Sequence, residues 1–576
     1  MPRVAAIVSR MRQTSQGCAL IRRLHGAPLT LVAPSRELRS ARRRLSTALG
    51  ATSRRSAMRG FAVSWQDEQP MGRRASLGLA VALVYALFSY AGIRSPDGEV
   101  MYRTAEAIAR AGEFSIEPLE QWPDFGVAAG RDGAHYGKYG PALPLLASPL
   151  AWVGLQIDSM PGVSGLATLG PSHFCGDGLA AMVDRRAPSS APSHVKRSLV
   201  SLFNVVVGAF AAIAMLRLLE QLGLGRAGVI AGSAAFAFGT PMLAYSGTFF
   251  SEPLVTLCLL STLAGIAAWD TKPDGQRSAS WRLLEPGAWL GLAVAAHLTA
   301  ALWLPFLGAY VAVTAGVRRD SAARIAAALG CLALGTLVAV GGLLAFNVAR
   351  FGSVVETGRP AADYAFVGPW NNIVPLLTSW GKGIFVLCPL TLLGLFAWPQ
   401  MIRGRPGLGL LLIGGVAARV TLFASFHDWH GGFGPGPRYP LPEIAVLALG
   451  AGLWLDGCLT RGRRHAVLAV TIVCACIAEQ SWIASGEVFS WCHRWRAAFA
   501  ARGASVFVDD LLYRDFTLSP LAPAFGLNGM AGPAIARALD VVPAAFAVVA
   551  TFLLCVGTAA AILRARRGAV LESSAE

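Results

Sequence analysis

Long apolar runs separated by polar connections dominate the chain. An α-helix needs about 17 to 25 predominantly apolar residues to cross a bilayer, and twelve segments approach or reach that length. The pattern predicts an all-α polytopic membrane protein with about 12 transmembrane helices. A thirteenth run, 141–157, is ambiguous. The twelve lie near residues 75–93, 198–218, 227–246, 253–269, 286–301, 302–317, 325–346, 381–399, 407–425, 440–457, 465–485 and 541–563.

The charges of the short loops decide the role of 141–157. If this run does not cross, six basic clusters with sixteen positive residues share the side of the basic N-terminus, whereas a crossing would gain only four positive residues there. Positive residues in short loops mark the cytoplasmic side. Three prolines in 141–157 also suit an interfacial or re-entrant helix better than a straight span. The six clusters are Arg217 with Arg226; Lys272, Arg277 and Arg282; Arg318, Arg319 and Arg324; Arg403 and Arg405; Arg461, Arg463 and Arg464; and Arg564, Arg566 and Arg567.

The predicted topology has both termini in the cytoplasm, and the polar connections 94–197 and 486–540 outside. It depends on reading 286–317 as two short passes around Pro305. Reporter fusions after Gly178 and after Asp363 are both expected to read outside. A cytoplasmic signal at Gly178 would show that 141–157 crosses the membrane.

Composition supports a membrane protein. The 576 residues are 54% hydrophobic and only 14% charged, with a mean hydropathy of +0.51, which excludes an ordinary soluble domain. The net charge of +17 is concentrated at the start, because residues 1–74 hold fifteen Arg against three acids and leave +5 for the remaining 502 residues. This distribution is typical of membrane topology and not of nucleic-acid binding.

The chain divides into three predicted parts. Residues 1–70 are rich in Arg, Ser and Ala and lack sustained apolar periodicity, so we expect a disordered basic segment, with one short helix near 36–49 as an option. It is either a dispensable leader before a start at Met58 or Met71, a solvated cytoplasmic tail, or a targeting segment. Residues 71–568 form the membrane domain, and 569–576 a short cytoplasmic tail.

Seven of the ten cysteines lie in or at the ends of apolar segments, where Cys packs as a small hydrophobe. Cys175 and Cys492 fall in the outside connections instead. A disulfide between them is possible in that compartment, but two free thiols are the favoured expectation.

Acidic residues at the mouths of predicted spans are the first candidates for catalysis. Asp97 and Glu99 follow the first span at the start of a predicted helix, 97–111, and Glu252 precedes Pro253 and another span. A carboxylate that is covered by apolar residues at the end of a span can serve as a general base. The alternative is structural, because Asp97 and Glu252 also stand at helix N-termini, where acids cap.

Cations and aromatic residues follow in the motif HYGKYGPAL, where Tyr136 and Lys138 precede a Pro-rich apolar run, and in SWGKGIF, which contains Lys382. Ammonium groups bind phosphoryl oxygens as point charges. A lone Lys at an interface can equally snorkel toward water. Arg350 and Arg359 are weaker candidates on the same side. Arg419 and His297, both inside spans, are functional candidates because ionisable groups are costly in a membrane.

The stretch HDWHGGFGPGPRYP, residues 427–440, is the least usual part of the sequence. Its density of Gly and Pro predicts a fixed backbone that approaches another group closely. Arg438 is predicted to anchor phosphate bidentately, with His430 as a further substrate-binding residue. His427 and Asp428, with Glu252, could hold a metal, although the spacing lacks a helical i, i+4 frame.

Together these motifs resemble the GT-C superfamily of polytopic glycosyltransferases, in particular protein O-mannosyltransferases and lipid A aminoarabinose transferases. The resemblance covers roughly residues 75–460. It equates Asp97 with an early acid of the first outside loop, Lys138 in KYGPAL with a loop lysine, and Glu252 in SEPL with a second acid. The early acids here are D-G-E and not an adjacent pair, so Asp97 and Glu99 both remain candidates.

The resemblance implies an inverting glycosyltransferase in the bacterial inner membrane. It would move a sugar from a polyprenyl-phosphate donor to an extracytoplasmic hydroxyl acceptor on a glycolipid, polysaccharide or protein. Asp97 or Glu99 would deprotonate the acceptor, Lys138 and Arg438 would stabilise the phosphate, and Glu252 would orient the sugar or help to hold a divalent ion. The alternatives are a lipid or sugar flippase and a non-catalytic cell-envelope scaffold.

Overall fold

The computed structural model describes residues 71–93, 95–118, 124–160, 194–271, 279–359, 366–432, 434–486, 500–501, 503, 514–523 and 533–575. The chain separates into two units, 1–69 and 70–576, and everything below concerns the second. The expectations for the basic N-terminal segment, for Cys175 and for Cys492 lie outside the described residues. The seven described cysteines are free thiols.

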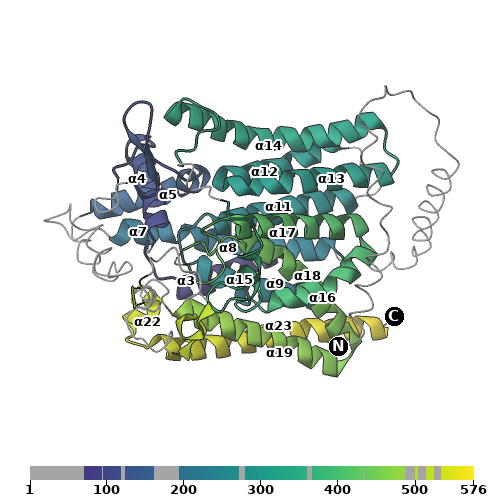
Figure 1. The fold of residues 1–576 in the computed structure, drawn as a ribbon. Helices are drawn as coiled ribbons and strands as arrows, with labels where there is room; N and C mark the ends of the chain where they lie inside the picture. The colour runs from purple at the N-terminus through teal and green to yellow at the C-terminus, as the bar shows by residue number, and fades with distance from the viewer. Residues whose placement is uncertain are drawn as a thin grey trace, which may run out of the picture. The chain divides into compact units, whose positions relative to one another are not determined.

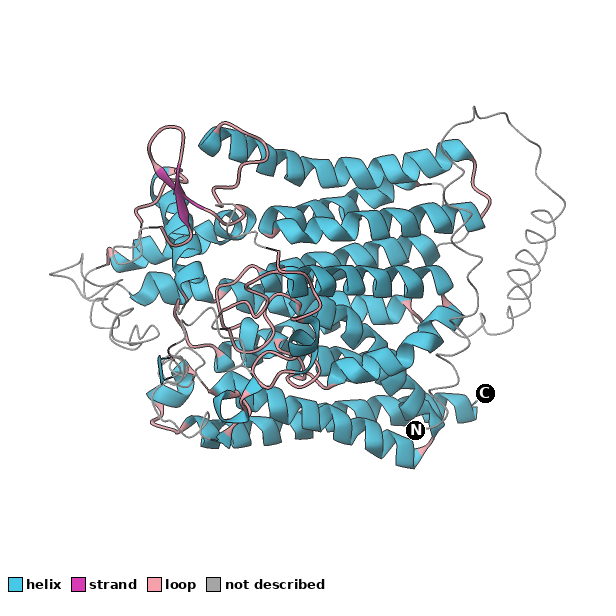
Figure 2. Ribbon diagram, in the orientation of Figure 1, coloured by secondary structure: helices cyan, strands magenta, loops and turns pink. Residues whose placement is uncertain are grey.

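The membrane domain is helical, and the chain is a multi-pass membrane protein (Figures 1 and 2). Within the described ranges, eight helices are long and apolar enough to cross a membrane; the total of twelve stays a prediction. The long helices are α3 (Met71–Phe88), α8 (Phe203–Gln221), α9 (Arg226–Phe238), α11 (Glu252–Thr271), α12 (Leu284–Ala296), α13 (Trp303–Val317), α14 (Ala322–Phe351), α16 (Leu390–Gly404), α17 (Pro406–Ser425), α18 (Leu441–Arg461), α19 (Arg463–Ser485) and α23 (Pro543–Ala575). α23 thus continues through the predicted tail.

Smaller elements gather at one end of these helices, which we call the α4 end (Figure 1). They are α4 (Pro96–Ala111), α5 (Ala142–Asp158) and α7 (His194–Ser201), together with an antiparallel hairpin of β1 (Val127–Ala129) and β2 (His135–Gly137). The all-α prediction missed this hairpin, because each strand has only three residues and carries no detectable alternation. α5 packs against α4 and α7, where the sequence predicted an interfacial helix. Short helices elsewhere are α10 (Met242–Tyr245), α15 (Ile373–Thr378) and α22 (Ala534–Ala538).

Polar contacts join the helices at the end opposite α4. Arg405 donates to the Gln221 carbonyl at 3.1 Å, and Arg566 donates to the Leu459 carbonyl at 2.9 Å. Arg318 pairs with Asp270. Members of three of the predicted basic clusters therefore lie at this opposite end, because the helices that carry them alternate in direction.

The chain reverses direction at His297, between α12 and α13. His297 is extended, with φ −152° and ψ 113°, and a short 3₁₀ turn, η6 (Leu298–Leu302), follows it. Trp303 then reaches Glu443 at the start of α18, while Tyr310, two turns later, donates to Asp270 near the end of α11 at 2.9 Å. The geometry therefore agrees with the prediction of two short passes within 286–317.

Glycines let α12 and α14 touch backbone to backbone. A Cβ added at Gly287 would lie 2.2 Å from the Leu332 carbonyl oxygen, and one at Gly291 would lie 2.4 Å from that of Thr336. Helices in membranes approach closely at such small residues. The contact holds α12 in place, and with it His297 at the α4 end.

Candidate active site

The first turn of α4 presents Asp97. Ser95 caps the helix, since its Oγ accepts a hydrogen bond from the Gly98 N–H at 2.9 Å, and Pro96 occupies the first turn. The capping role that the sequence offered to Asp97 therefore belongs to Ser95. The Asp97 carboxylate is left available for other contacts.

Asp97 meets residues that are distant in the sequence. The Tyr139 hydroxyl donates to Asp97 Oδ1 at 2.5 Å, and Arg438 Nη1 donates to Oδ2 at 2.5 Å. The side chain keeps 18% of its surface exposed. Hydrogen bonds of this kind fix the orientation of the carboxylate.

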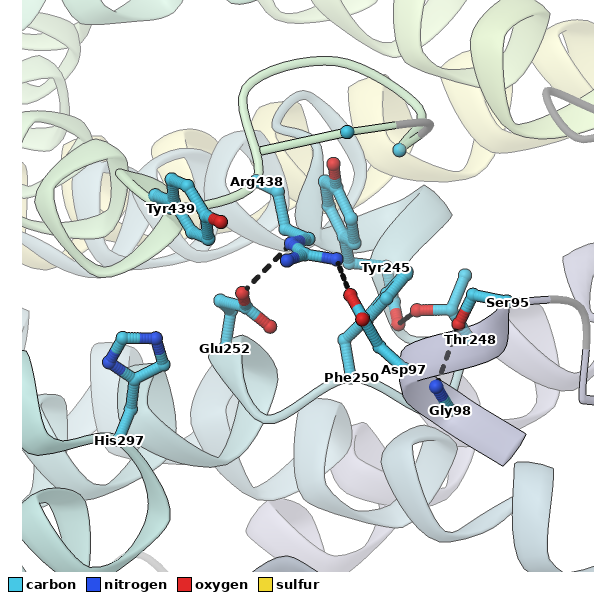
Figure 3. Close-up of polar contacts among 12 residues, drawn as sticks. Ser95, Asp97, Gly98, Tyr245, Thr248, Phe250, Glu252, His297, Arg438 and Tyr439 are labelled. Carbon is cyan, nitrogen blue, oxygen red and sulfur yellow. Dashed lines mark hydrogen bonds and ion pairs between the residues drawn. The ribbon is translucent and has the colours of Figure 1, made fainter. Parts of the chain in front are cut away.

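Arg438 links Asp97 to Glu252, as Figure 3 shows. Its Nε lies 3.2 Å from Glu252 Oε1, and its guanidinium carbon lies 4.6 Å from the Phe250 ring centroid and 5.0 Å from that of Tyr439. Burial opposes the charge of Arg438, yet the two carboxylates hold its pKa well above the ordinary value. One cation thus bridges two acids at the α4 end.

Two side chains fix the backbone around this bridge. Asn204 donates from Nδ2 to the carbonyls of Thr248 and Phe250, at 2.8 Å each, which sets the turn before Glu252. The Tyr245 hydroxyl donates to the Gly436 carbonyl at 3.1 Å, which ties the loop carrying Arg438 to α10. Hydrogen bonds from α8 and α10 therefore hold both loops in position.

Lys382 is fully buried and lies under the glycine-rich loop. Its ammonium donates to the carbonyls of Gly432, Gly434 and Gly436 at 2.6, 3.0 and 3.4 Å. Gly432 and Gly436 have φ of 67° and 105°, which few other residues adopt. The sequence proposed Lys382 as a substrate ligand, but here its protons are engaged by the loop, so it shapes the backbone that carries Arg438.

Substituting Lys382 by Met is expected to destabilise the protein by at least about 2 kcal/mol, because three buried carbonyls lose their donor. Thermal unfolding of purified wild type and Lys382→Met measures this loss, and equal unfolding temperatures would contradict the account.

Glu99, the other early acid, points into a separate ion cluster. Its carboxylate is buried and pairs with Arg103 at 3.1 Å and with Arg197 at 2.9 Å. Burial opposes ionisation, but Arg197 above all holds the pKa of Glu99 below its usual value. A carboxylate enclosed by two guanidinium groups is a poor proton acceptor, so the geometry favours Asp97 as the base and gives Glu99 the task of joining α4 to α7.

The candidate residues of the motif HYGKYGPAL contact different parts of the structure. The Tyr136 hydroxyl donates to Asp132 at 2.6 Å on the hairpin, and the Lys138 ammonium lies 3.3 Å from the Asp124 carbonyl. Tyr136 is thus bound within the hairpin, and Lys138 contacts the segment that leads into it. Tyr139, which was quoted in the motif but not selected, is the member that reaches Asp97; its position beside the candidate lysine was the only signal for it.

The histidines brace the loop 427–440. His430 is buried, accepts from the Gly432 N–H at Nδ1, 3.0 Å, and lies 3.2 Å from Asp428. Burial lowers the pKa of His430 well below its ordinary value, which opposes the cationic form that a phosphate ligand would need. Tyr439 donates to Asp428 at 3.2 Å, and His427 is exposed.

The predicted metal site is not assembled in the described part of the chain, which contains no group of three or more His, Cys, Asp or Glu side chains able to hold an ion. His427 and Asp428 do not join Glu252. The positive charge between Asp97 and Glu252 is instead that of Arg438.

Arg350 and Arg359, the two arginines that the sequence predicted to lie outside, differ in role. Arg350 is buried, donates to the carbonyl of Gly137 at 2.5 Å and to Asn347 Oδ1 at 2.8 Å, and therefore fastens the β-hairpin to α14. Arg359 is half-buried, and its guanidinium carbon lies 5.9 Å from the Tyr139 ring centroid. Arg359 is thus a second cation beside the residue that holds Asp97.

No protein-family model matches the chain, and no curated protein sequence matches it. Solved structures do. ArnT from Cupriavidus metallidurans bound to undecaprenyl phosphate is 15% identical over 87% of this chain and 78% of that one, with a TM-score of 0.45. The Archaeoglobus fulgidus oligosaccharyltransferase in the apo form is 13% identical over 83% and 69%, with a TM-score of 0.42.

The S. cerevisiae protein O-mannosyltransferase Pmt1–Pmt2 complex bound to the sugar donor is 18% identical over 51% of this chain and 35% of that chain, with a TM-score of 0.31. Likenesses with TM-scores below 0.5 and identities below 20% carry no conclusion about this chain, so the function is inferred from the residues of the site.

Proposed function

We propose that the chain is an inverting glycosyltransferase that moves a sugar from a polyprenyl-phosphate donor to a hydroxyl acceptor on the extracytoplasmic face of the bacterial inner membrane. The observation that carries the proposal is the convergence of Asp97, Tyr139, Glu252 and Arg438, from four separate segments, at one end of the membrane helices. Both termini would lie in the cytoplasm, with the α4 end outside.

Asp97 would act as the general base. As the acceptor oxygen forms its bond to the anomeric carbon, its proton passes to the Asp97 carboxylate, and the bond from that carbon to the phosphate oxygen breaks. The electron pair leaves with the phosphate, so the products are the glycosylated acceptor and the polyprenyl phosphate. Tyr139 and Arg438 support this role, because they bind one carboxylate oxygen each and leave further lone pairs for the proton.

Arg438 and Arg359 would stabilise the departing phosphate. A guanidinium has five N–H donors, and the contacts of Arg438 to the two acids use Nη1 and Nε only. Arg359 stands over Tyr139 and takes the place that the sequence gave to Lys138. Charges in a partly dry site act more strongly than in water, which suits a reaction whose leaving group develops charge.

The test is the pool of lipid-linked sugars in a strain that lacks the gene. The transferase account predicts that the unused polyprenyl-phosphate sugar accumulates in lipid extracts, as measured by mass spectrometry, and returns to the normal level when wild-type protein is supplied. An unchanged pool would contradict the account. A donor that accumulates on the cytoplasmic leaflet alone would identify a flippase instead.

A further inference from the structure

Four buried polar atoms near the Arg438 bridge have no hydrogen-bond partner among the described residues. They are Glu252 Oε2, Arg419 Nε and Nη1, and Glu443 Oε2, and their residues are only 5%, 1% and 0% exposed. Arg419 Nε has an ion-pair contact, which leaves three atoms unaccounted for. A buried polar group left unpaired costs about 1–3 kcal/mol, so these three atoms in neighbouring residues point to a bound polar molecule that satisfies them.

The residues that carry these atoms are linked by contacts in space. Arg419 on α17 and Glu443 on α18 form an ion pair at 2.7 Å, and Trp303 donates to Glu443 Oε1 at 3.1 Å. Arg419 lies 5.0 Å from the Phe423 ring centroid. Phe423 in turn stacks on Tyr439, with ring centroids 5.3 Å apart.

Tyr439 connects Arg419 and Phe423 to the proposed active site. It lies under the Arg438 guanidinium at 5.0 Å and beside the His297 ring at 6.4 Å. Arg419 is also near enough to Glu252 to interact with it electrostatically. Figure 3 shows Tyr439 and His297 on the side of Glu252 away from Asp97, and Arg419 is connected to this side through Phe423 and Tyr439.

Carboxylates that only join helices look different in this protein. Both oxygens of Asp270 accept hydrogen bonds, from Tyr310 and from Arg318, and both oxygens of Glu99 accept from Arg197. Glu252 and Glu443 each keep one oxygen unpaired. The helix-joining pair Arg318–Asp270 also leaves one guanidinium nitrogen, Arg318 Nη1, without a hydrogen bond, but both oxygens of its carboxylate are engaged.

The donor set selects the chemistry of the ligand. Glu252 and Glu443 offer acceptors, Arg419 offers a donor, and His297 adds a ring nitrogen beyond the Nδ1 that meets Thr299. Two carboxylates repel a phosphate, and the guanidinium of Arg419 repels a metal ion. Neutral hydroxyl groups, which both donate and accept, fit all of these atoms.

We infer that the sugar ring of the lipid-linked donor binds on this side of the bridge, with Glu252, Arg419, Glu443 and His297 as its hydroxyl-binding residues. This inference rests on the proposed function. It gives the buried Arg419–Glu443 pair a role in donor specificity, and it places the hydroxyls of the sugar away from the base Asp97.

The test compares two charge-neutral double variants. Arg419→Met with Glu443→Gln removes the pair but keeps the oxygen that Trp303 needs. Arg318→Met with Asp270→Asn removes the helix-joining pair at the opposite end and serves as the control. The donor is the lipid-linked sugar purified from the strain that lacks the gene, and KM, kcat and the unfolding temperature are measured for purified proteins.

The expected result is a donor KM at least about tenfold higher in the Arg419/Glu443 variant, and within about twofold of wild type in the control. An unchanged KM in the first variant overturns the inference. If that variant does not fold, Arg419→Lys decides, because it keeps the charge beside Glu443 and removes the planar donors: KM should rise about fivefold, and no rise overturns the inference. A wild type that consumes no donor would refute the proposed function itself, which is a different outcome.

Discussion

Replacing Asp97 by Asn is expected to lower kcat by about 10²–10⁴-fold, the usual contribution of a general base. The substitution keeps the shape of the side chain, and the amide oxygen can still accept a hydrogen bond from Tyr139 or Arg438, so the protein should insert and fold. What is lost is the capacity to take the acceptor proton. The measurement is turnover of purified protein with the lipid-linked donor, alongside its unfolding temperature.

Glu99→Gln is the matched control, because Glu99 is an acid of the same helix turn but is enclosed by Arg103 and Arg197. It should reduce stability, since two buried guanidinium groups lose their counter-charge, and should retain turnover per folded molecule. A fully active Asp97→Asn together with an inactive Glu99→Gln would move the base to Glu99. If both variants remain active, this enzymatic account is wrong.

Replacing Arg438 by Met is expected to have the second-largest effect. Activity should fall at least about a hundredfold, or about 2.7 kcal/mol of transition-state stabilisation, because one charge partner of the phosphate is lost. Stability should fall as well, by about 3–5 kcal/mol, since Asp97 and Glu252 are left as unpaired, largely buried acids. Assays of kcat and of thermal unfolding separate the two effects.

Arg438→Lys should recover stability more than activity, because an ammonium restores the charge but cannot contact both acids and the phosphate in one plane. Lys138→Met tests the other candidate cation: its ammonium contacts the Asp124 carbonyl, and turnover should fall less than in Arg438→Met. A large loss in Lys138→Met, with little change in Arg438→Met, would return the phosphate role to the lysine.

The sequence predicted the helices well, because membrane spans are long and their signal is composition. It also found Asp97, Glu252 and Arg438, since each stands where a polar segment meets an apolar run. It could not find their convergence: Asp97 and Arg438 are 341 positions apart, and no local pattern records which loops meet.

The sequence also predicted the roles of some residues less well than their positions, for a similar reason. Asp97 and Ser95 both stand where a cap can stand, and only the geometry shows that Ser95 takes the bond. Lys382 reads as an exposed loop cation because its neighbours are Gly and Trp, yet it is buried under carbonyls that come from residues about fifty positions later. Glu443 follows Pro442 in an apolar run and carried no functional signal until its unpaired oxygen was located.

The most direct test of the central claim is the fate of the lipid-linked donor with purified protein and an acceptor extract. The account predicts that wild type converts the donor to free polyprenyl phosphate, one molecule for each sugar transferred, with inverted anomeric configuration in the product, and that Asp97→Asn converts it at least about a hundredfold more slowly. Equal conversion by the two proteins, or passage of the intact donor across a vesicle membrane without release of polyprenyl phosphate, would contradict it.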